Sequence, residues 1–252
     1  MKPCASALTV TGRRSNNEDA FVVDPELGLF AVADGMGGYE GGEIASQLAL
    51  DEIRAFLRAL RDSPEPPVPP TAPEQSPDER VVAQAIRVAH RSVMSARTVQ
   101  TRRMGTTIAT LVQPRPDAPF VVAHVGDSRV YRYRGGEVTQ LTRDHSFLEE
   151  LRQCGALGPD EGMPESVGGR LTRALGMSGW EHPTVTRICQ APGDRYLICT
   201  DGLSCALDNQ AIAAILARQP PAEAARQLVD AALARGSRDN ITAVVVCVPA
   251  AA

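Results

Sequence analysis

Five aspartates occupy positions where short carboxylates could meet at one rim of a sheet. Four of them stand beside Gly or Asn at turn-like positions, and most lie at the edge of an apolar run: Asp19, Asp34, Asp127, Asp201 and Asp239. Clustered carboxylates repel one another unless a cation neutralises them. A site with only oxygen ligands suits Mg²⁺ or Mn²⁺ rather than zinc. The pattern therefore predicts a metal-dependent enzyme that acts on a phosphorylated substrate.

Composition narrows the class of protein. The chain has 252 residues, 43% of them hydrophobic, which is ample for a buried core. A net charge of −4 argues against a dedicated nucleic-acid binder, which usually carries a basic face. The N-terminus has no signal-like stretch, and no apolar run approaches the roughly 20 residues that span a bilayer. We therefore expect a cytoplasmic protein with no nucleic-acid or membrane partner.

The six cysteines show no Cys-x-x-Cys pair and no zinc-like spacing with histidine. Cys189 and Cys199 fall inside apolar runs and are predicted to be small buried residues. This distribution indicates a reduced, intracellular compartment.

Hydrophobic periodicity predicts an α+β domain with antiparallel sheets and helices outside them. Strands are expected at about 20–23, 27–34, 106–112, 120–125, 129–134, 137–141, 184–189, 195–199 and 241–248. Helices are expected at about 43–60, 78–98, 146–153, 210–217 and 222–234. The proline-rich stretch 63–77 is predicted to be a loop or stiff linker, because proline blocks both helix and central strand.

Any single Asp-Gly pair is a common turn dipeptide, so each aspartate alone is weak evidence. The ordered combination of motifs is far more specific. The first half comprises Arg14-x-x-Asn17-Glu18-Asp19, Ala33-Asp34-Gly35-Met36-Gly37-Gly38, Gly42-Glu43-x-Ala45-Ser46 and Met104-Gly105-Thr106-Thr107. The second half comprises Val125-Gly126-Asp127-Ser128-Arg129, Leu141-Thr142-x-Asp144-His145-Ser146, Cys199-Thr200-Asp201-Gly202-Leu203 and Arg238-Asp239-Asn240-Ile241-Thr242. Nearly the whole chain thus resembles the metal-dependent Ser/Thr protein phosphatases, the PPM or type 2C family, in its compact bacterial form.

This resemblance implies one domain over residues 1–252, with two antiparallel sheets packed between outer helices in four layers. It implies a flap at about 145–180, whereas the proline-rich loop at about 63–77 is longer than a compact member of the family needs. The implied reaction is hydrolysis of phosphoserine and phosphothreonine by a metal-bridging water, in opposition to a bacterial Ser/Thr kinase. Phosphorylated proteins, including the kinase and its substrates, are the implied partners, and a monomer is the default expectation.

The resemblance also assigns roles to residues. Asp34 bridges two Mn²⁺ or Mg²⁺ ions, and the Gly35 carbonyl binds the first of them. The remaining implied metal ligands are Asp19, Asp201 and Asp239, with Glu18 as a possible addition and Asp127 joining Asp201 at a third ion. Arg14 holds the substrate phosphate through a planar guanidinium that matches phosphate oxygens.

Besides the proline-rich loop, the chain departs from the bacterial pattern in the flap, and like other bacterial members it lacks a histidine found in eukaryotic relatives. Many eukaryotic relatives carry a histidine two residues after the bridging aspartate, where this chain has Met36, so no general acid is assigned. The stretch 163–169 differs from the corresponding part of bacterial flaps. Structural roles are expected for His145, Ser128 and Arg129. The alternatives are a non-catalytic pseudophosphatase that binds a partner, a small-molecule phosphatase, or a phosphatase of a sigma-factor switch.

Overall fold

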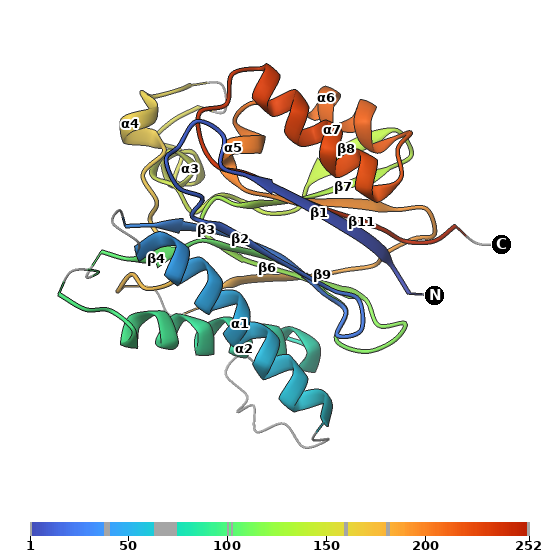
Figure 1. Cartoon of the computed structure of the whole chain (residues 1–252), viewed down its shortest axis with the longest axis horizontal. Helices are drawn as coiled ribbons and strands as arrows, with labels where there is room; N and C mark the ends of the chain where they lie inside the picture. Colours follow the sequence, from blue (N-terminus) through green and yellow to red (C-terminus); the bar gives the residue numbers. More distant parts are fainter. Residues whose placement is uncertain are drawn as a thin grey trace.

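The computed structural model describes residues 2–37, 41–62, 75–99, 101, 103–158, 161–179 and 182–250. Two antiparallel sheets face each other, and helices cover both outer faces (Figure 1). This is the four-layer α+β sandwich expected from the sequence. Most of the proline-rich stretch 63–77 lies outside the described residues.

The first sheet has five strands in the order β1-β11-β10-β7-β8. Their bounds are β1 Cys4–Val10, β11 Ile241–Cys247, β10 Arg195–Cys199, β7 Arg129–Arg134 and β8 Glu137–Gln140. The second sheet has the order β2-β3-β5-β6-β9, and a short β4 also pairs with β3. These strands are β2 Asp19–Asp24, β3 Leu29–Met36, β4 Gly105–Thr106, β5 Ile108–Val112, β6 Phe120–Val125 and β9 Thr184–Ile188.

The helices divide between the two outer faces. The second sheet is covered by α1 Gly41–Asp62 and α2 Pro77–Ser95, and the first by α6 Asn209–Leu216 and α7 Pro221–Ala234 (Figure 1). Short helices α3 Phe147–Gln153, α4 Glu165–Gly168 and α5 Asp201–Ser204 lie in the connections. Within the described residues, no helix is both long enough and apolar enough to cross a membrane.

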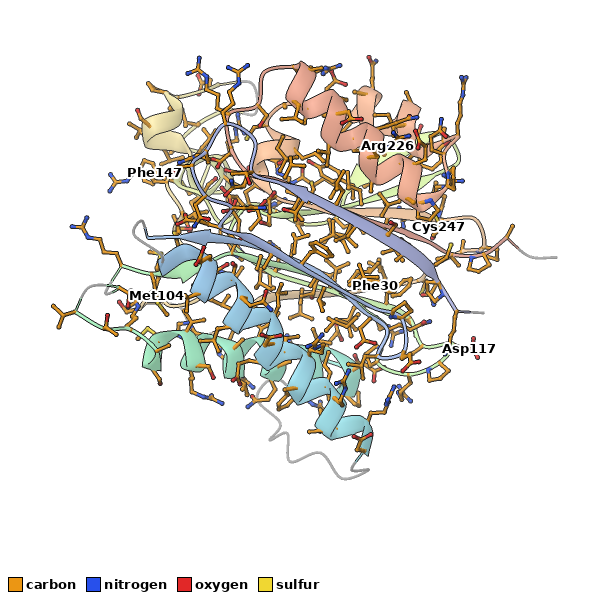
Figure 2. The ribbon with its side chains drawn as sticks, in the orientation of Figure 1. Phe30, Met104, Asp117, Phe147, Arg226 and Cys247 are labelled. Atoms are coloured by element: carbon orange, nitrogen blue, oxygen red, sulfur yellow. The ribbon has the colours of Figure 1, made fainter. Side chains whose placement is uncertain are left out.

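Side-chain alternation along the strands explains the three apolar layers. In β3, Phe30 and Val32 point into the sandwich, while Leu29 and Ala31 pack toward α1 and α2. Because a strand turns successive side chains to opposite faces, an all-apolar run like β3 must be covered on both sides. Phe30 lies in this buried interior in Figure 2.

Helix α2 begins where local chemistry predicts a start. The Ser76 hydroxyl accepts a hydrogen bond from the Glu79 backbone N–H, and the Glu79 carboxylate accepts one from the Ser76 N–H. Pro77 occupies the first helical position, where a missing N–H is harmless. This reciprocal cap places the start of the helix at the residue after Ser76.

The structure adds elements that the sequence pattern did not predict. Strand β1 was missed because Cys4–Val10 mixes small and polar residues, and its strand character comes from pairing with β11. The strand expected at 106–112 is divided into β4 and β5, and the short helices α4 and α5 are below the length that periodicity detects. Cys199 is buried as expected, but Cys189 is exposed: it follows β9, an edge strand of the second sheet.

Candidate functional site

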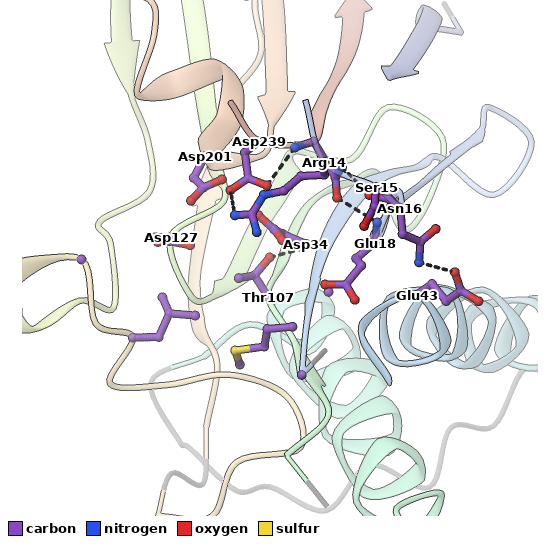
Figure 3. Close-up of a pocket in the computed structure, with 16 residues that line it drawn as sticks. Arg14, Ser15, Asn16, Glu18, Asp34, Glu43, Thr107, Asp127, Asp201 and Asp239 are labelled. Atoms are coloured by element: carbon purple, nitrogen blue, oxygen red, sulfur yellow. Dashed lines mark hydrogen bonds and ion pairs between the residues drawn. The ribbon is translucent and has the colours of Figure 1, made fainter. Parts of the chain in front are cut away.

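A cleft of about 940 Å³ opens at one end of the two sheets (Figure 3). Acidic side chains dominate its wall, together with one arginine and backbone of the β3 turn. The residues that line it are Arg14, Ser15, Asn16, Glu18, Asp34, Gly35, Met36, Gly37, Glu43, Thr107, Asp127, Gly169, Leu171, Asp201, Asp239 and Asn240. Of the candidate site residues, only Asp19 is missing from this lining.

Strand ends bring the carboxylates together from distant parts of the chain. Asp19 and Asp34 are directly opposite in the β2–β3 ladder, so their side chains share one face. Asp201 follows the last residues of β10, and Asp239 precedes β11, the neighbouring strand. Asp127 lies in the turn between β6 and β7. Strand ends from both sheets therefore bring these aspartate side chains together at one end of the sandwich.

Burial and mutual repulsion raise the pKa values of these acids. The pKa of Asp34 lies well above its ordinary value, first because of burial and then because of repulsion by Asp19 and Asp201. Burial raises the pKa of Asp19 to about 7 and that of Asp127 to about 7. The pKa of Asp201 is also raised, by burial and then by Asp239. Without a cation, this site disfavours its own ionised form.

The donor set fits divalent metal ions. Asp19 Oδ1 and Asp201 Oδ1 are buried and have no hydrogen-bond partner, so each leaves a carboxylate oxygen available to a cation. An unpaired buried carboxylate is unfavourable unless a cation or proton compensates it. The acids do not form a closed ligand set, because across the described segments no three His, Cys, Asp or Glu residues are grouped closely enough to hold a metal. The unpaired oxygens and the raised pKa values of Asp19 and Asp201 nevertheless show buried carboxylates that lack a compensating positive charge.

A chain of hydroxyl groups orients Asp19. Its Oδ2 accepts hydrogen bonds from Thr242 Oγ1 at 2.6 Å and from Thr200 Oγ1 at 2.8 Å. Thr9 Oγ1 lies 2.7 Å from Thr242 Oγ1, and Asn17 Nδ2 donates to Thr9 Oγ1 at 2.9 Å. Because the only Thr242 hydroxyl proton goes to Asp19, the Thr9 hydroxyl must donate to Thr242. This arrangement occupies Oδ2 and leaves Oδ1 free of donors.

A second pair of hydroxyls connects Asp34 with the turn that carries Asp127. The Asp34 backbone N–H donates to Thr107 Oγ1 at 3.0 Å, and Thr107 Oγ1 lies 2.7 Å from Ser128 Oγ. Gly126 has a φ of 102°, and a Cβ there would lie 2.6 Å from Thr107 Cγ2. Glycine is therefore required for both conformation and space at this turn. The contact supports the structural role expected for Ser128.

Gly35 allows the chain to approach the start of α1 closely. A Cβ at Gly35 would lie 2.1 Å from the Gly42 carbonyl oxygen and 2.6 Å from the Glu18 carbonyl oxygen. No side chain can be accommodated at those distances. The Glu18 carboxylate in turn lies against Gly42, and burial raises the pKa of Glu18.

Arg14 forms an ion pair with Asp239, one of the candidate metal ligands. Its Nη2 donates to Asp239 Oδ2 at 2.6 Å, and the Arg14 side chain is 61% exposed at the cleft mouth (Figure 3). Hydrogen bonding to Asp239 raises the pKa of Arg14. The guanidinium thus brings positive charge to the cleft and keeps donors that face solvent.

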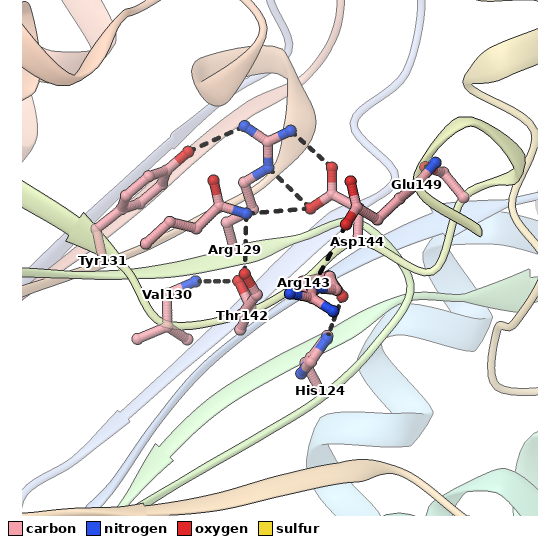
Figure 4. A network of polar contacts seen from close by, with 10 residues as sticks. His124, Arg129, Val130, Tyr131, Thr142, Arg143, Asp144 and Glu149 are labelled. Atoms are coloured by element: carbon pink, nitrogen blue, oxygen red, sulfur yellow. Dashed lines mark hydrogen bonds and ion pairs between the residues drawn. The ribbon is translucent and has the colours of Figure 1, made fainter. Parts of the chain in front are cut away.

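His145 and Arg129 hold the surrounding backbone. His145 Nδ1 accepts from the Gly126 N–H at 3.1 Å, and its ring stacks on His124 with centroids 4.5 Å apart. Burial, followed by His124, lowers the pKa of His145 to about 3. Arg129 donates two hydrogen bonds to Asp144, at 2.9 and 2.6 Å (Figure 4). Both side chains have the structural surroundings expected from the sequence.

The segment expected as a flap reaches the cleft. Ser146 and Leu171 form an isolated β-bridge, and a second bridge joins Leu175 to Thr106. Gly169 and Leu171 contribute to the cleft wall. The altered stretch 163–169 therefore contains α4 and reaches the cleft wall at Gly169.

Several polar residues that organise the site were not assigned roles from the sequence. Thr9, Thr200, Thr242 and Thr107 are hydroxyl partners of the acidic segments. Asn240 accepts from the Glu18 N–H and donates to two backbone carbonyls. For all of these except Thr9, the available signal was their position inside the quoted motifs; Thr9 precedes the first motif and had no such signal.

Comparison with known proteins agrees with this geometry. The family model described as protein phosphatase 2C matches residues 11–236. The chain is 34% identical to the serine/threonine protein phosphatase PstP of Mycobacterium tuberculosis, over 92% of this chain and 42% of that relative. It is 30% identical to protein phosphatase PhpP of Streptococcus pneumoniae over 96% of both chains.

Solved structures give the same result. The catalytic domain of PstP in complex with two manganese ions superposes with a TM-score of 0.79 at 32% identity, covering 98% of this chain and 99% of that one. The match extends over both sheets and the cleft between their ends. The chain therefore belongs to the protein phosphatase 2C family.

Proposed function

We propose that this chain is a metal-dependent protein phosphatase that hydrolyses phosphoserine and phosphothreonine. The observation that carries the proposal is the convergence of Asp34, Asp127, Asp201 and Asp239 with Arg14 in one cleft. Similarity to bacterial proteins named as Ser/Thr phosphatases, one of them in complex with manganese, supports it.

The proposed ligands of two divalent ions, Mn²⁺ or Mg²⁺, follow from position. Asp34 is the bridging candidate because it is repelled by four other aspartates, which places it at the centre of the acidic group. The Gly35 carbonyl and the side chains of Asp19, Asp201 and Asp239 would complete the pair. Asp127 with Asp201 would hold a third ion, and Glu18 remains a possible ligand.

Each residue then has a physical task. Bound divalent cations would neutralise the carboxylates, bind phosphate oxygens and acidify a water for attack on phosphorus. Arg14 orients the phosphate by charge-assisted hydrogen bonds from its solvent-facing donors. Thr200 and Thr242 hold Asp19 in one orientation, so that the same carboxylate oxygen always faces the acidic group.

The leaving alkoxide has no assigned proton donor among the protein side chains. Among the described residues of the cleft wall there is no histidine, and Met36 occupies the position where many eukaryotic relatives carry one. We propose that solvent supplies this proton. The proposed substrates are phosphoproteins, and a bacterial Ser/Thr kinase is the class of enzyme that would produce them.

The test compares a phosphothreonine peptide with a sugar phosphate as substrates, in Mn²⁺, in Mg²⁺ and in EDTA. The central variant is Asp201→Asn, with Asp230→Asn on the exposed face of α7 as a matched control. We expect turnover of the peptide that needs metal, is lost in Asp201→Asn and persists in Asp230→Asn. Preference for the sugar phosphate would replace the protein-phosphatase assignment, and absence of turnover in folded, metal-loaded protein would leave a binding module.

A further inference from the structure

Two cysteines far apart in sequence face each other across the first sheet. Cys4 of β1 and Cys247 of β11 are directly opposite in the antiparallel register. Directly opposite residues in such a ladder project from the same face of the sheet. Cys4 Sγ lies 3.7 Å from the Cys247 carbonyl oxygen, so the first thiol already lies over the second residue. Figure 2 shows Cys247 at the end of the sandwich where both chain termini lie.

The backbone separation suits a covalent link. Opposite residues of an antiparallel pair have Cα atoms about 4.5–5.5 Å apart. A disulfide spans Cα separations of about 4.4–6.8 Å. The bond could therefore form between Cys4 and Cys247 by side-chain rotation, without movement of either strand.

The thiols of Cys4 and Cys247 differ in their exposure to solvent. Cys4 is exposed, whereas Cys247 is only 9% exposed and packs with the layer beneath α7. Burial raises the pKa of the Cys247 thiol to about 11, while the neighbouring Arg195 opposes that shift. Cys4 is thus the thiol that a soluble oxidant reaches first, and Cys247 is the partner that resolves the product.

We propose that Cys4 and Cys247 are a modification site, at which a peroxide converts the two thiols into a cross-strand disulfide. Cys4 sulfur attacks hydrogen peroxide, the O–O bond breaks, and Cys4 sulfenic acid and water form. The Cys4 thiol proton leaves with that first water. Cys247 sulfur then attacks the sulfenic sulfur, the S–O bond breaks, and the sulfenic hydroxyl takes the Cys247 thiol proton and leaves as a second water. The two sulfurs lose two electrons in total, and the peroxide accepts them.

The link would fasten an edge strand of the first sheet. β1 lies at one edge of that sheet, and among the described strands it pairs there with β11 alone. Its far end carries Thr9, which contacts Thr242, and the chain continues from there to Arg14. The Cys4–Cys247 pair lies five residues along the ladder from the Thr9–Thr242 pair, a distance of about 17 Å. The bond therefore stabilises the strand that supports the cleft without entering the cleft.

The test treats the metal-free 252-residue chain with hydrogen peroxide in EDTA and measures intact mass, disulfide-linked peptides and thermal unfolding. We expect loss of two hydrogen atoms, a Cys4–Cys247 linked peptide, and a midpoint raised by roughly 5–10 °C that dithiothreitol reverses. The bond closes a loop of nearly the whole chain, which is why the unfolded state is strongly restricted.

Three variants make the result specific. Cys4→Ser changes only an exposed edge position and is expected to abolish both the mass loss and the rise in midpoint. Cys247→Ser should do the same, and Cys189→Ser, an exposed cysteine outside the strands, should retain both effects. Oxidation that stops at added oxygen on Cys4, or a linked peptide from another pair, overturns the proposal. A Cys4–Cys247 disulfide that leaves the midpoint of thermal unfolding unchanged also overturns the proposal.

Discussion

Replacing Thr242 by valine should weaken metal binding without unfolding the protein. Thr242 is fully buried, and its hydroxyl donates to Asp19 Oδ2 at 2.6 Å. Valine has nearly the same shape, so the change removes the donor and leaves the packing of β11 almost intact. Thr200 still donates to the same oxygen at 2.8 Å, so Asp19 keeps one of its two hydroxyl donors.

The size of the effect follows from the lost hydrogen bond. A hydrogen bond to a charged group contributes about 1.5–3 kcal/mol, and loss of such support around a metal ligand typically lowers affinity by about 10–100-fold. Because one donor remains, we expect the lower end, about tenfold weaker binding of Mn²⁺. The pKa of Asp19 is already about 7, and losing a donor to the ionised form raises it further. Protons then compete better with the metal, so the loss should be larger at pH 6.5 than at pH 8.

The assay is calorimetric titration of Mn²⁺ into EDTA-stripped, dialysed protein at both pH values. Thr110→Val is the matched control, because Thr110 is equally buried but donates only to the Ala123 carbonyl. Thermal unfolding of both metal-free variants checks that the fold is retained. Wild-type affinity in Thr242→Val at both pH values would refute the reasoning, because Asp19 would then not depend on this hydroxyl or would not be a ligand.

Three further changes test other parts of the structure. Arg14→Ala should lower kcat/KM for a phosphothreonine peptide by about 10–100-fold, because charge-assisted hydrogen bonds to phosphate are lost, as measured by steady-state kinetics. Asp194→Ala should lower the free energy of unfolding in urea by about 3 kcal/mol, since Asp194 is 1% exposed and accepts from Arg134 and Tyr196; a change below about 1 kcal/mol would contradict this. The pKa of His145 is lowered to about 3, so the folded state binds fewer protons than the unfolded state, and stability present above about pH 6.5 is lost as the pH falls. Between pH 6.5 and 5 the contribution is up to about 2 kcal/mol, and urea unfolding of His145→Gln should show a flatter pH dependence than wild type.

Sequence periodicity identified most elements because their burial is regular. The runs at 108–112, 120–125 and 241–247 are buried throughout, and the amphipathic helix α1 buries one stripe against β3. Strand β1 was not predicted, because an edge strand with few large apolar residues shows little hydrophobic pattern in the sequence. The same limit applies to Cys189, whose apolar neighbours did not lead to burial.

The candidate acids were identified from residue type and motif order, but the sequence did not predict which of them face or contact one another. The β2–β3 register places Asp19 opposite Asp34, and after burial the Asp19 charge is the largest cause that raises the pKa of Asp34. Arg14 was expected to contact phosphate, yet it also binds Asp239. The Arg14–Asp239 contact joins residues more than 200 positions apart, and the register depends on how two strands pair, so no local pattern encodes either.

By itself, the sequence determined the class of fold, the acidic residues and the phosphatase-like order of motifs. These depend on local properties: side-chain chemistry, turn residues and the spacing of apolar positions. Only the tertiary structure decided which oxygens remain unpaired, which hydroxyls orient Asp19, and that Cys4 lies opposite Cys247. Those features arise when strands from both ends of the chain pair in one sheet, because burial and hydrogen bonding are then set by neighbours in space rather than in sequence.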